Sequence, residues 1–117
     1  MKKLLLAAAL LGVLPLAAQA EEEKVLNLYN WTEYMPKDVL KAFTKETGIK
    51  VKESNYAATE EMYSKLKAGG GGYDLVVPST YFVQRMAREG LLEPLDHTKL
   101  PNLKNVDPKF LDKPFDP

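Results

Sequence analysis

The chain has 117 residues, with 16 basic and 16 acidic side chains, no cysteine and a single histidine. This charge balance, without any basic run, argues against a nucleic-acid partner. The lack of cysteine excludes disulfides and thiolate metal sites, and His97 has no neighbouring ligands at metal spacing, so we expect no metal site and a solvated loop position for this histidine.

The first 20 residues have the features of a secretory signal peptide. Lys2 and Lys3 form a basic start, an apolar run follows, and Ala18-Gln19-Ala20 is a small-residue cleavage site. The apolar run is too short for a helix that stays in the membrane, and a buried N-terminal helix would not explain the three features together. We therefore predict cleavage after Ala20, export, and a mature chain, 21–117, with a net charge of 14 − 16 = −2.

Strand and helix patterns alternate along the mature chain. Apolar runs predict strands at Lys24–Tyr29, Ile49–Ser54 and Tyr73–Val77. Helical spacing of apolar residues predicts helices at Pro36–Thr47, Glu60–Lys67 and Phe82–Glu89. This order is typical of an α/β fold in which a parallel sheet, joined by right-handed crossovers, is covered by helices on both faces.

Capping residues and apolar faces refine the three helices. Gly48 is a suitable C-terminal stop for the first, Thr59 is the expected N-cap of the second, and Ser79 or Thr80 caps the third. The side chains expected to face inward are Val39, Leu40, Phe43, Met62, Leu66, Phe82, Val83 and Met86. The third strand, a continuous apolar run, fits a buried parallel position. After Asp96 we expect loops, with at most a short helix near Pro108–Leu111.

The four glycines at Gly69–Gly72 form the only low-complexity stretch. A phosphate-binding glycine loop needs a strand before it and a helix after it, whereas this run follows a helix and precedes a strand. We therefore interpret it as a flexible connection.

Polar and aromatic side chains follow the first and third predicted strands. The carboxyl ends of parallel strands lie at the same edge of a sheet, so the two segments are expected to share a rim. The residues at that rim are Trp31, Thr32, Glu33, Tyr34, Ser79, Thr80 and Tyr81. Two aromatic rings beside a carboxylate can hold an organic cation, since ring faces and carboxylate both attract positive charge. The alternative is that Trp31 and Tyr34 only pack in a core.

The rim lacks the residue pairs that hydrolysis requires. A nucleophilic Ser79 would need a histidine nearby, and His97 is the sole histidine, while Asp74 lies within a strand. A helix cap or a ligand contact suits Ser79 better. We therefore expect a binding protein without a cofactor and not an enzyme.

Three motifs give a more specific indication: Tyr29–Tyr34, Phe43–Val51 and Tyr73–Tyr81. Together with the final Lys113–Pro117, they closely resemble the family of periplasmic spermidine/putrescine-binding proteins, the substrate receptors of polyamine ABC importers. The resemblance implies a two-lobed periplasmic-binding-protein fold of type II. It also implies a periplasmic protein that delivers its ligand to the transmembrane subunits of an ABC permease. It also implies ligand contacts by Trp31 and Tyr34 with methylene groups, and by Thr32, Glu33, Ser79 and Tyr81 with amino groups.

The length departs from the family pattern. Members are roughly three times longer than one such domain, as two lobes require. We therefore expect residues 21–117 to be the N-terminal part of the first lobe, without the second lobe, and we expect weak or absent binding by this part alone. Three alternatives stay open: a receptor for another solute, an exported enzyme on the same core, and an exported interaction domain. An anion receptor would offer basic groups or helix N-termini at the rim, and Glu33 argues against it.

Overall fold

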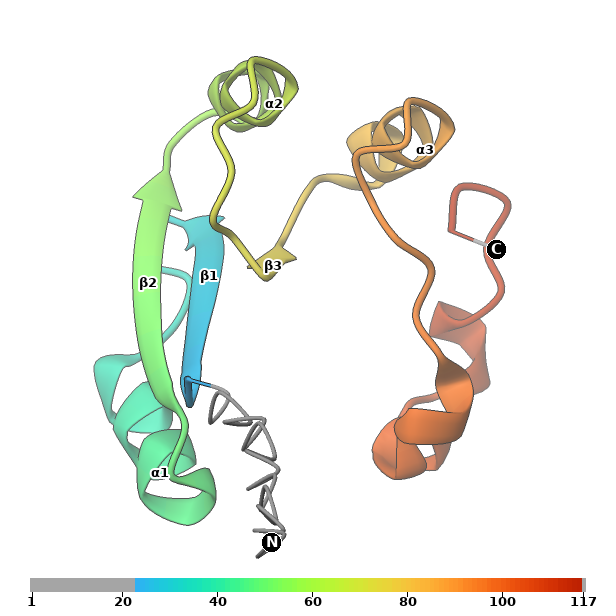
Figure 1. The fold of residues 1–117 in the computed structure, drawn as a ribbon. Helices are drawn as coiled ribbons and strands as arrows, with labels where there is room; N and C mark the ends of the chain where they lie inside the picture. Colours follow the sequence, from blue (N-terminus) through green and yellow to red (C-terminus); the bar gives the residue numbers. More distant parts are fainter. Residues whose placement is uncertain (1–22, 117) are drawn as a thin grey trace, which may run out of the picture.

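A three-stranded parallel sheet with the order β2-β1-β3 organises the chain (Figure 1). The computed structural model describes residues 23–116, so the predicted signal peptide and its cleavage after Ala20 lie outside the described residues. Strands β1, β2 and β3 span Val25–Trp31, Lys50–Tyr56 and Leu75–Val76. Helices α1, α2 and α3 span Lys37–Thr47, Thr59–Lys67 and Thr80–Arg88. The predicted strand-helix alternation and parallel sheet are confirmed.

Helices α2 and α3 pack over one face of the sheet and enclose the core. Its buried side chains are Tyr29, Tyr56, Met62, Tyr63, Phe82 and Met86, and Leu66 packs against them. Met62 and Met86 are completely buried, as their helical spacing predicted. Burial of apolar surface of this kind is the main stabilising contribution to the fold.

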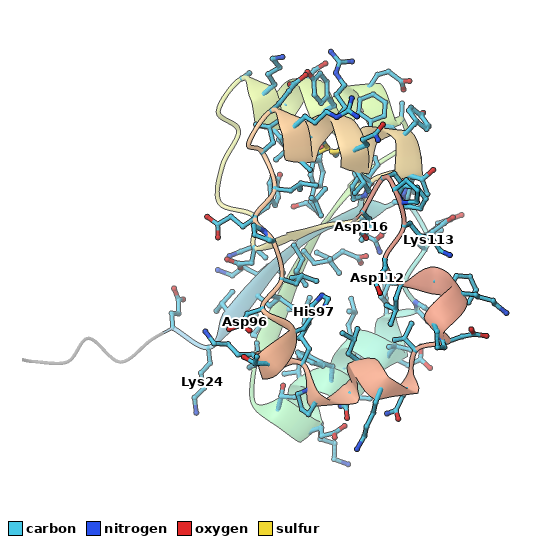
Figure 2. All side chains as sticks on the ribbon, turned by 90° about the vertical axis from the view of Figure 1, so that its right-hand side faces the viewer. Lys24, Asp96, His97, Asp112, Lys113 and Asp116 are labelled. Atoms are coloured by element: carbon cyan, nitrogen blue, oxygen red, sulfur yellow. The ribbon has the colours of Figure 1, made fainter. Side chains whose placement is uncertain are left out.

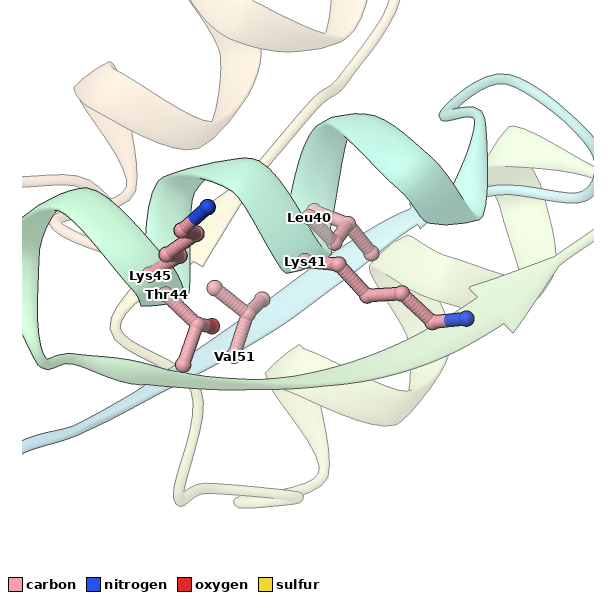
Figure 3. A pocket seen from close by; sticks show the side chains of 5 residues that line it. All are labelled: Leu40, Lys41, Thr44, Lys45 and Val51. Atoms are coloured by element: carbon pink, nitrogen blue, oxygen red, sulfur yellow. The ribbon is translucent and has the colours of Figure 1, made fainter.

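Helix α1 lies on the other face, beside β2. Leu40 and Thr44 of α1 border a shallow hollow whose floor is Val51 of β2 (Figure 3). No residue of α1 is buried, and Val39 and Phe43 are exposed by 49% and 38%. The prediction that these two side chains face inward was therefore wrong for the described residues, because nothing among them covers that side of the helix.

Of the three predicted cap positions, those of Gly48 and Ser79 are confirmed and that of Thr59 was wrong. Gly48 ends α1 as expected, in the left-handed conformation at φ 74°, and its amide donates to the Thr44 carbonyl at 2.9 Å. Ala58, not Thr59, occupies the N-cap position of α2. Ser79 occupies the N-cap position of α3, but its side chain makes no capping bond. The hydroxyls of Thr59 and Ser79 bond to each other instead, at 3.1 Å.

The third strand is shorter and more exposed than predicted. It contains only Leu75 and Val76, which pair with Leu28 and Tyr29 of β1. Leu75 is 47% exposed, because β3 is an edge strand of the described sheet and pairs on one side only. The expectation of a buried position was wrong for this residue.

The C-terminal part of the described chain consists of short 3-10 helices. They span His97–Lys99, Pro101–Asn105 and Pro108–Phe110. Only the last was predicted, and His97 is exposed, as expected. Among residues 23–116, no helix is long and apolar enough to span a membrane.

Candidate functional site

The turn after β1 carries four of the six residues predicted to bind ligand. Trp31 is the last residue of β1, which extends two residues further than predicted. Thr32 is fixed against the end of β2: its amide and its hydroxyl both donate to the Tyr56 carbonyl, at 3.0 and 3.2 Å. The Tyr34 amide donates to the Trp31 carbonyl at 3.3 Å and closes the turn. These bonds fix the backbone that presents all four side chains.

Glu33 stands at the tip of this turn with a positive φ of 61°. A non-glycine residue in this region of conformational space carries a modest strain, and such residues gather at functional sites. Its side chain is exposed and makes no ion pair with any residue from 23 to 116. The carboxylate is thus available to a cation from outside the described chain.

Aromatic rings form a row along this edge of the sheet. The ring centroids of Trp31 and Tyr34 are 6.1 Å apart, and those of Trp31 and Tyr56 are 4.7 Å apart. Tyr56 in turn meets the buried Tyr29 edge to face, at 4.9 Å. The row runs from the core to Tyr34, which is 69% exposed. Trp31 therefore packs on the core through Tyr56, as one of the two alternatives predicted, and it lies beside the exposed Tyr34.

The segment after β3 reaches the same edge, as the parallel topology predicted. The Val77 amide donates to the Tyr29 carbonyl at 3.2 Å, and the Tyr56 hydroxyl donates to the Val77 carbonyl. Ser79, two residues further, is bonded to Thr59 of α2. Tyr81 is 63% exposed and packs on Phe82, with ring centroids 4.9 Å apart.

The structure thus places Trp31 and Thr32 in contact with Tyr56, which also bonds to Val77, two residues before Ser79. Sequence reasoning missed Tyr56, because the second strand was predicted to end at Ser54, whereas it ends at Tyr56. Because the carboxyl ends of parallel strands lie at one edge, a prediction that ended β2 at Tyr56 would have placed this residue at the rim.

Burial controls the chemistry of Tyr56. The side chain is almost completely buried, and this desolvation, followed by the proximity of Tyr29 and Tyr34, raises the pKa of Tyr56 to about 12. The hydroxyl therefore keeps its proton at neutral pH and acts as a hydrogen-bond donor. Its acceptor is the backbone carbonyl of Val77.

An ammonium group on aromatic faces already occurs in this fold. The Lys65 Nζ lies 4.9 Å from the Tyr29 ring centroid and 5.2 Å from the Tyr73 ring centroid. The two rings are stacked, with centroids 4.4 Å apart. The same cation–π attraction is open to an external cation at Tyr34, whose ring is largely exposed.

The Ser79 hydroxyl has a threonine as its partner, and no histidine or carboxylate is bonded to it within residues 23–116. The described residues also contain no group of three or more His, Cys, Asp or Glu side chains placed to hold a metal ion. The arrangement at the rim can therefore orient and hold a ligand through rings, hydroxyls and one carboxylate.

A second hollow, of about 390 Å³, lies between α3 and the C-terminal segments. His97 and Asp112, on two different segments, border it (Figure 2). Its lining includes none of the six residues predicted to bind ligand.

A parallel sheet with helices on both faces, and polar and aromatic groups gathered at its carboxyl edge, defines a ligand-binding α/β lobe. The profile of the family described as bacterial extracellular solute-binding protein matches residues 30–117. The chain belongs to this family.

Curated relatives and solved structures agree with this assignment. The chain is 54% identical over 114 residues to the spermidine/putrescine-binding periplasmic protein of Escherichia coli K12, covering 97% of this chain and 33% of that protein. It is 45% identical over 107 residues to the putrescine-binding periplasmic protein PotF of the same organism, covering 92% of this chain and 29% of that one. The chain therefore spans about a third of the length of the curated relatives it matches.

Among solved structures, the fold resembles the spermidine/putrescine ABC transporter substrate-binding protein PotD of Streptococcus pneumoniae. The TM-score is 0.76 at 43% identity, and the match covers 80% of this chain and 29% of that one. The lipoprotein Tp0655 (TpPotD) of Treponema pallidum matches with a TM-score of 0.69 at 44% identity, over 74% of this chain and 27% of that one. The expected periplasmic-binding-protein fold is confirmed.

Proposed function

We propose that this chain forms part of the ligand-binding lobe of a periplasmic receptor that captures spermidine or putrescine for an ABC importer. The observation that carries the proposal is the exposed Tyr34 ring beside Trp31, on the turn whose tip presents the Glu33 carboxylate, which makes no ion pair with any residue from 23 to 116. A polyamine alternates ammonium groups with methylene groups, so it is complementary to a surface that alternates carboxylate and aromatic faces. Relatives that share about half of the sequence are named as spermidine/putrescine binders, which supports this ligand class.

In this proposal the six residues have distinct roles. Trp31 and Tyr34 cover methylene groups, and Glu33 pairs with one ammonium group. Thr32, Ser79 and Tyr81 offer hydroxyl oxygens to amino groups. Residues 1–20 would direct export, residues 21–117 would be the N-terminal part of the first lobe, and the partners would be the transmembrane subunits of the permease.

The test is calorimetric titration of spermidine, putrescine and sulfate into two proteins. One is the chain itself, and the other is the chain extended by the remaining two-thirds of the Escherichia coli relative. We expect the extended protein to bind a polyamine and not sulfate. A folded extended protein, verified by circular dichroism, that binds neither polyamine would refute the proposal.

The variant Glu33→Gln tests whether the Glu33 carboxylate pairs with an ammonium group of the ligand. A hydrogen bond to a charged group contributes about 1.5–3 kcal/mol, so the variant should bind polyamine roughly 10- to 150-fold more weakly. Glu46→Gln is the matched control, because Glu46 is exposed in the last turn of α1, at the opposite end of the sheet. Equal affinities for the two variants would remove Glu33 from the site.

A further inference from the structure

Tyr56 makes three contacts with the two rim segments that no other described residue combines. Its carbonyl accepts both bonds from Thr32, its ring lies against Trp31, and its hydroxyl donates to the Val77 carbonyl. Thr32 and Trp31 belong to the turn after β1, and Val77 precedes the segment that carries Ser79. The Tyr56 side chain thus joins both halves of the rim through its ring and its hydroxyl, and its backbone carbonyl adds the two bonds from Thr32.

We infer that Tyr56 is a positioning residue that fixes the turn after β1 and the segment after β3 relative to each other. Only the expected effect of Tyr56 on ligand affinity rests on the proposed function. The linkage itself depends on contacts within this chain. Tyr56 contacts no ligand in this account and acts through Trp31, Thr32 and Val77.

The burial of Tyr56 makes this linkage rigid. The residue is 2% exposed and sits between the rings of Trp31 and Tyr29, so its ring has no room for another rotamer without displacing one of them. A buried hydroxyl that loses its acceptor is costly, so the bond to the Val77 carbonyl stabilises the position of the Tyr56 hydroxyl. Movement of the segment after β3 would therefore leave the buried Tyr56 hydroxyl without its acceptor, and movement of Trp31 would uncover the Tyr56 ring.

The linkage also reaches α2. The turn between β2 and α2 follows Tyr56 directly, and Thr59 at the start of α2 holds the Ser79 hydroxyl. Val77 and Ser79 are thus both bonded to residues within one four-residue stretch, 56–59. A ligand that touches Trp31 and Ser79 together would find their separation already set, which lowers the entropic cost of binding.

The test compares Tyr56→Phe with Tyr63→Phe. Both remove one hydroxyl from a buried ring in the same core, since Tyr63 is 8% exposed and its hydroxyl donates to Glu89 at 2.6 Å. The Tyr63 bond joins α2 to the end of α3, away from the rim segments. A general loss of core stability would therefore affect the two variants alike, whereas loss of the linkage affects only Tyr56→Phe.

The first measurement needs no ligand. Amide NMR signals of the chain are recorded for residues 31–34 and 77–81. Tyr56→Phe removes the bond to the Val77 carbonyl and keeps the ring beside Trp31. We expect it to shift signals in residues 77–81 directly and in residues 31–34 through the released ring, and we expect Tyr63→Phe to leave both segments unchanged. A Tyr56→Phe spectrum that changes in only one segment, or in neither, would overturn the inference.

The second measurement is polyamine affinity in the extended protein described above. We expect Tyr56→Phe to bind roughly 3- to 30-fold more weakly than the parent, as is usual for residues in one coupled network, and Tyr63→Phe to bind as the parent does. Equal losses in both variants would show that Tyr56 acts through stability alone and would overturn the positioning role. If the parent binds no polyamine, the proposed function fails, and the NMR comparison still decides the linkage.

Discussion

The four-glycine run offers a test of how closely the connection between α2 and β3 is packed. Gly70 lies directly behind helix α2, and its amide donates to the Lys65 carbonyl at 2.9 Å. A Cβ atom at Gly70 would lie 2.5 Å from that same oxygen and 2.8 Å from the Lys65 Cγ. At the neighbouring Gly71, a Cβ atom would meet nothing closer than the Gly69 carbonyl oxygen at 3.8 Å. The two glycines therefore differ in their surroundings, although they are adjacent.

Gly70→Ala should destabilise the fold, whereas Gly71→Ala should not. A methyl group forced into packed atoms costs typically about 1–3 kcal/mol. Both substitutions reduce the entropy of the unfolded chain equally, by about 0.4–1 kcal/mol, so this contribution cancels when the two variants are compared. The difference in the free energy of unfolding should thus be about 1–3 kcal/mol, or roughly 4–20 °C in Tm for a domain of this size.

The assay is urea unfolding of both variants, followed by circular dichroism at 222 nm and by the fluorescence of Trp31, the only tryptophan in the chain. The close contact involves the backbone oxygen of Lys65, so it cannot be relieved by rotation of the lysine side chain. Equal stability of Gly70→Ala and Gly71→Ala would refute the reasoning, and the connection would then be as flexible as the sequence alone suggested.

Three further changes test the core and its charges. Met62→Ala should lower the free energy of unfolding by about 2–5 kcal/mol, because Met62 is completely buried. Val39→Ala, at a 49% exposed position, should change it by less than about 0.5 kcal/mol. Urea unfolding measures both values. Hydrogen bonds from Lys67, then Tyr63 and Arg85, lower the pKa of Glu89 to about 2, so its stabilising effect is present above pH 4.5 and lost as the pH falls toward 2. Tm measured from pH 5 to 2 should therefore fall less steeply in Glu89→Gln than in the parent, and parallel curves would contradict this role. Burial raises the pKa of Tyr56 to about 12, so the folded chain keeps this proton while the unfolded chain loses it near pH 10. The free energy of unfolding should therefore fall by up to about 1.4 kcal/mol per pH unit between pH 10 and 12. Tyr56→Phe should remove this part of the alkaline slope in a pH series of urea unfolding curves, and an unchanged slope would contradict the assignment.

The alternation of strands and helices was predictable because each element carries its own local signal. The helical spacing of Met62 and Leu66 and the left-handed Gly48 after α1 are properties of short stretches of sequence, and the structure confirms them. The arrangement of the rim followed from topology, since parallel strands end at one edge. The end of the first predicted strand at Tyr29, together with the parallel order of the strands, sufficed to place Trp31 and Tyr34 at that edge.

The contacts within the rim were not predictable, because they depend on partners that are distant in the sequence. Thr59 looks like an N-cap in its own helix, but the nearby Ser79 hydroxyl, 20 residues away, pairs with it instead. The apolar run at β3 carries no information about how many neighbours the strand has, and Leu75 is half exposed because the described sheet ends there. Tyr56 follows the polar pair Ser54 and Asn55, which interrupts the pattern of alternation and hides the true end of β2.

In the proposed function, the rim of this chain alone would hold a polyamine only weakly. In that function, the Glu33 carboxylate would contribute about 1.5–3 kcal/mol through a charge-assisted bond, and the exposed Tyr34 ring would add about 0.5–1 kcal/mol toward a cation. Together these come to about 2–4 kcal/mol, which corresponds to a dissociation constant near 1 mM or weaker. A ligand with two or more ammonium groups leaves at least one of them without a carboxylate at this rim. The relatives are about three times as long as this chain, so their additional residues are the natural source of the missing carboxylates. Tyr56, by holding Trp31 and Ser79 at a fixed separation, would let such additional contacts act on a surface that is already ordered.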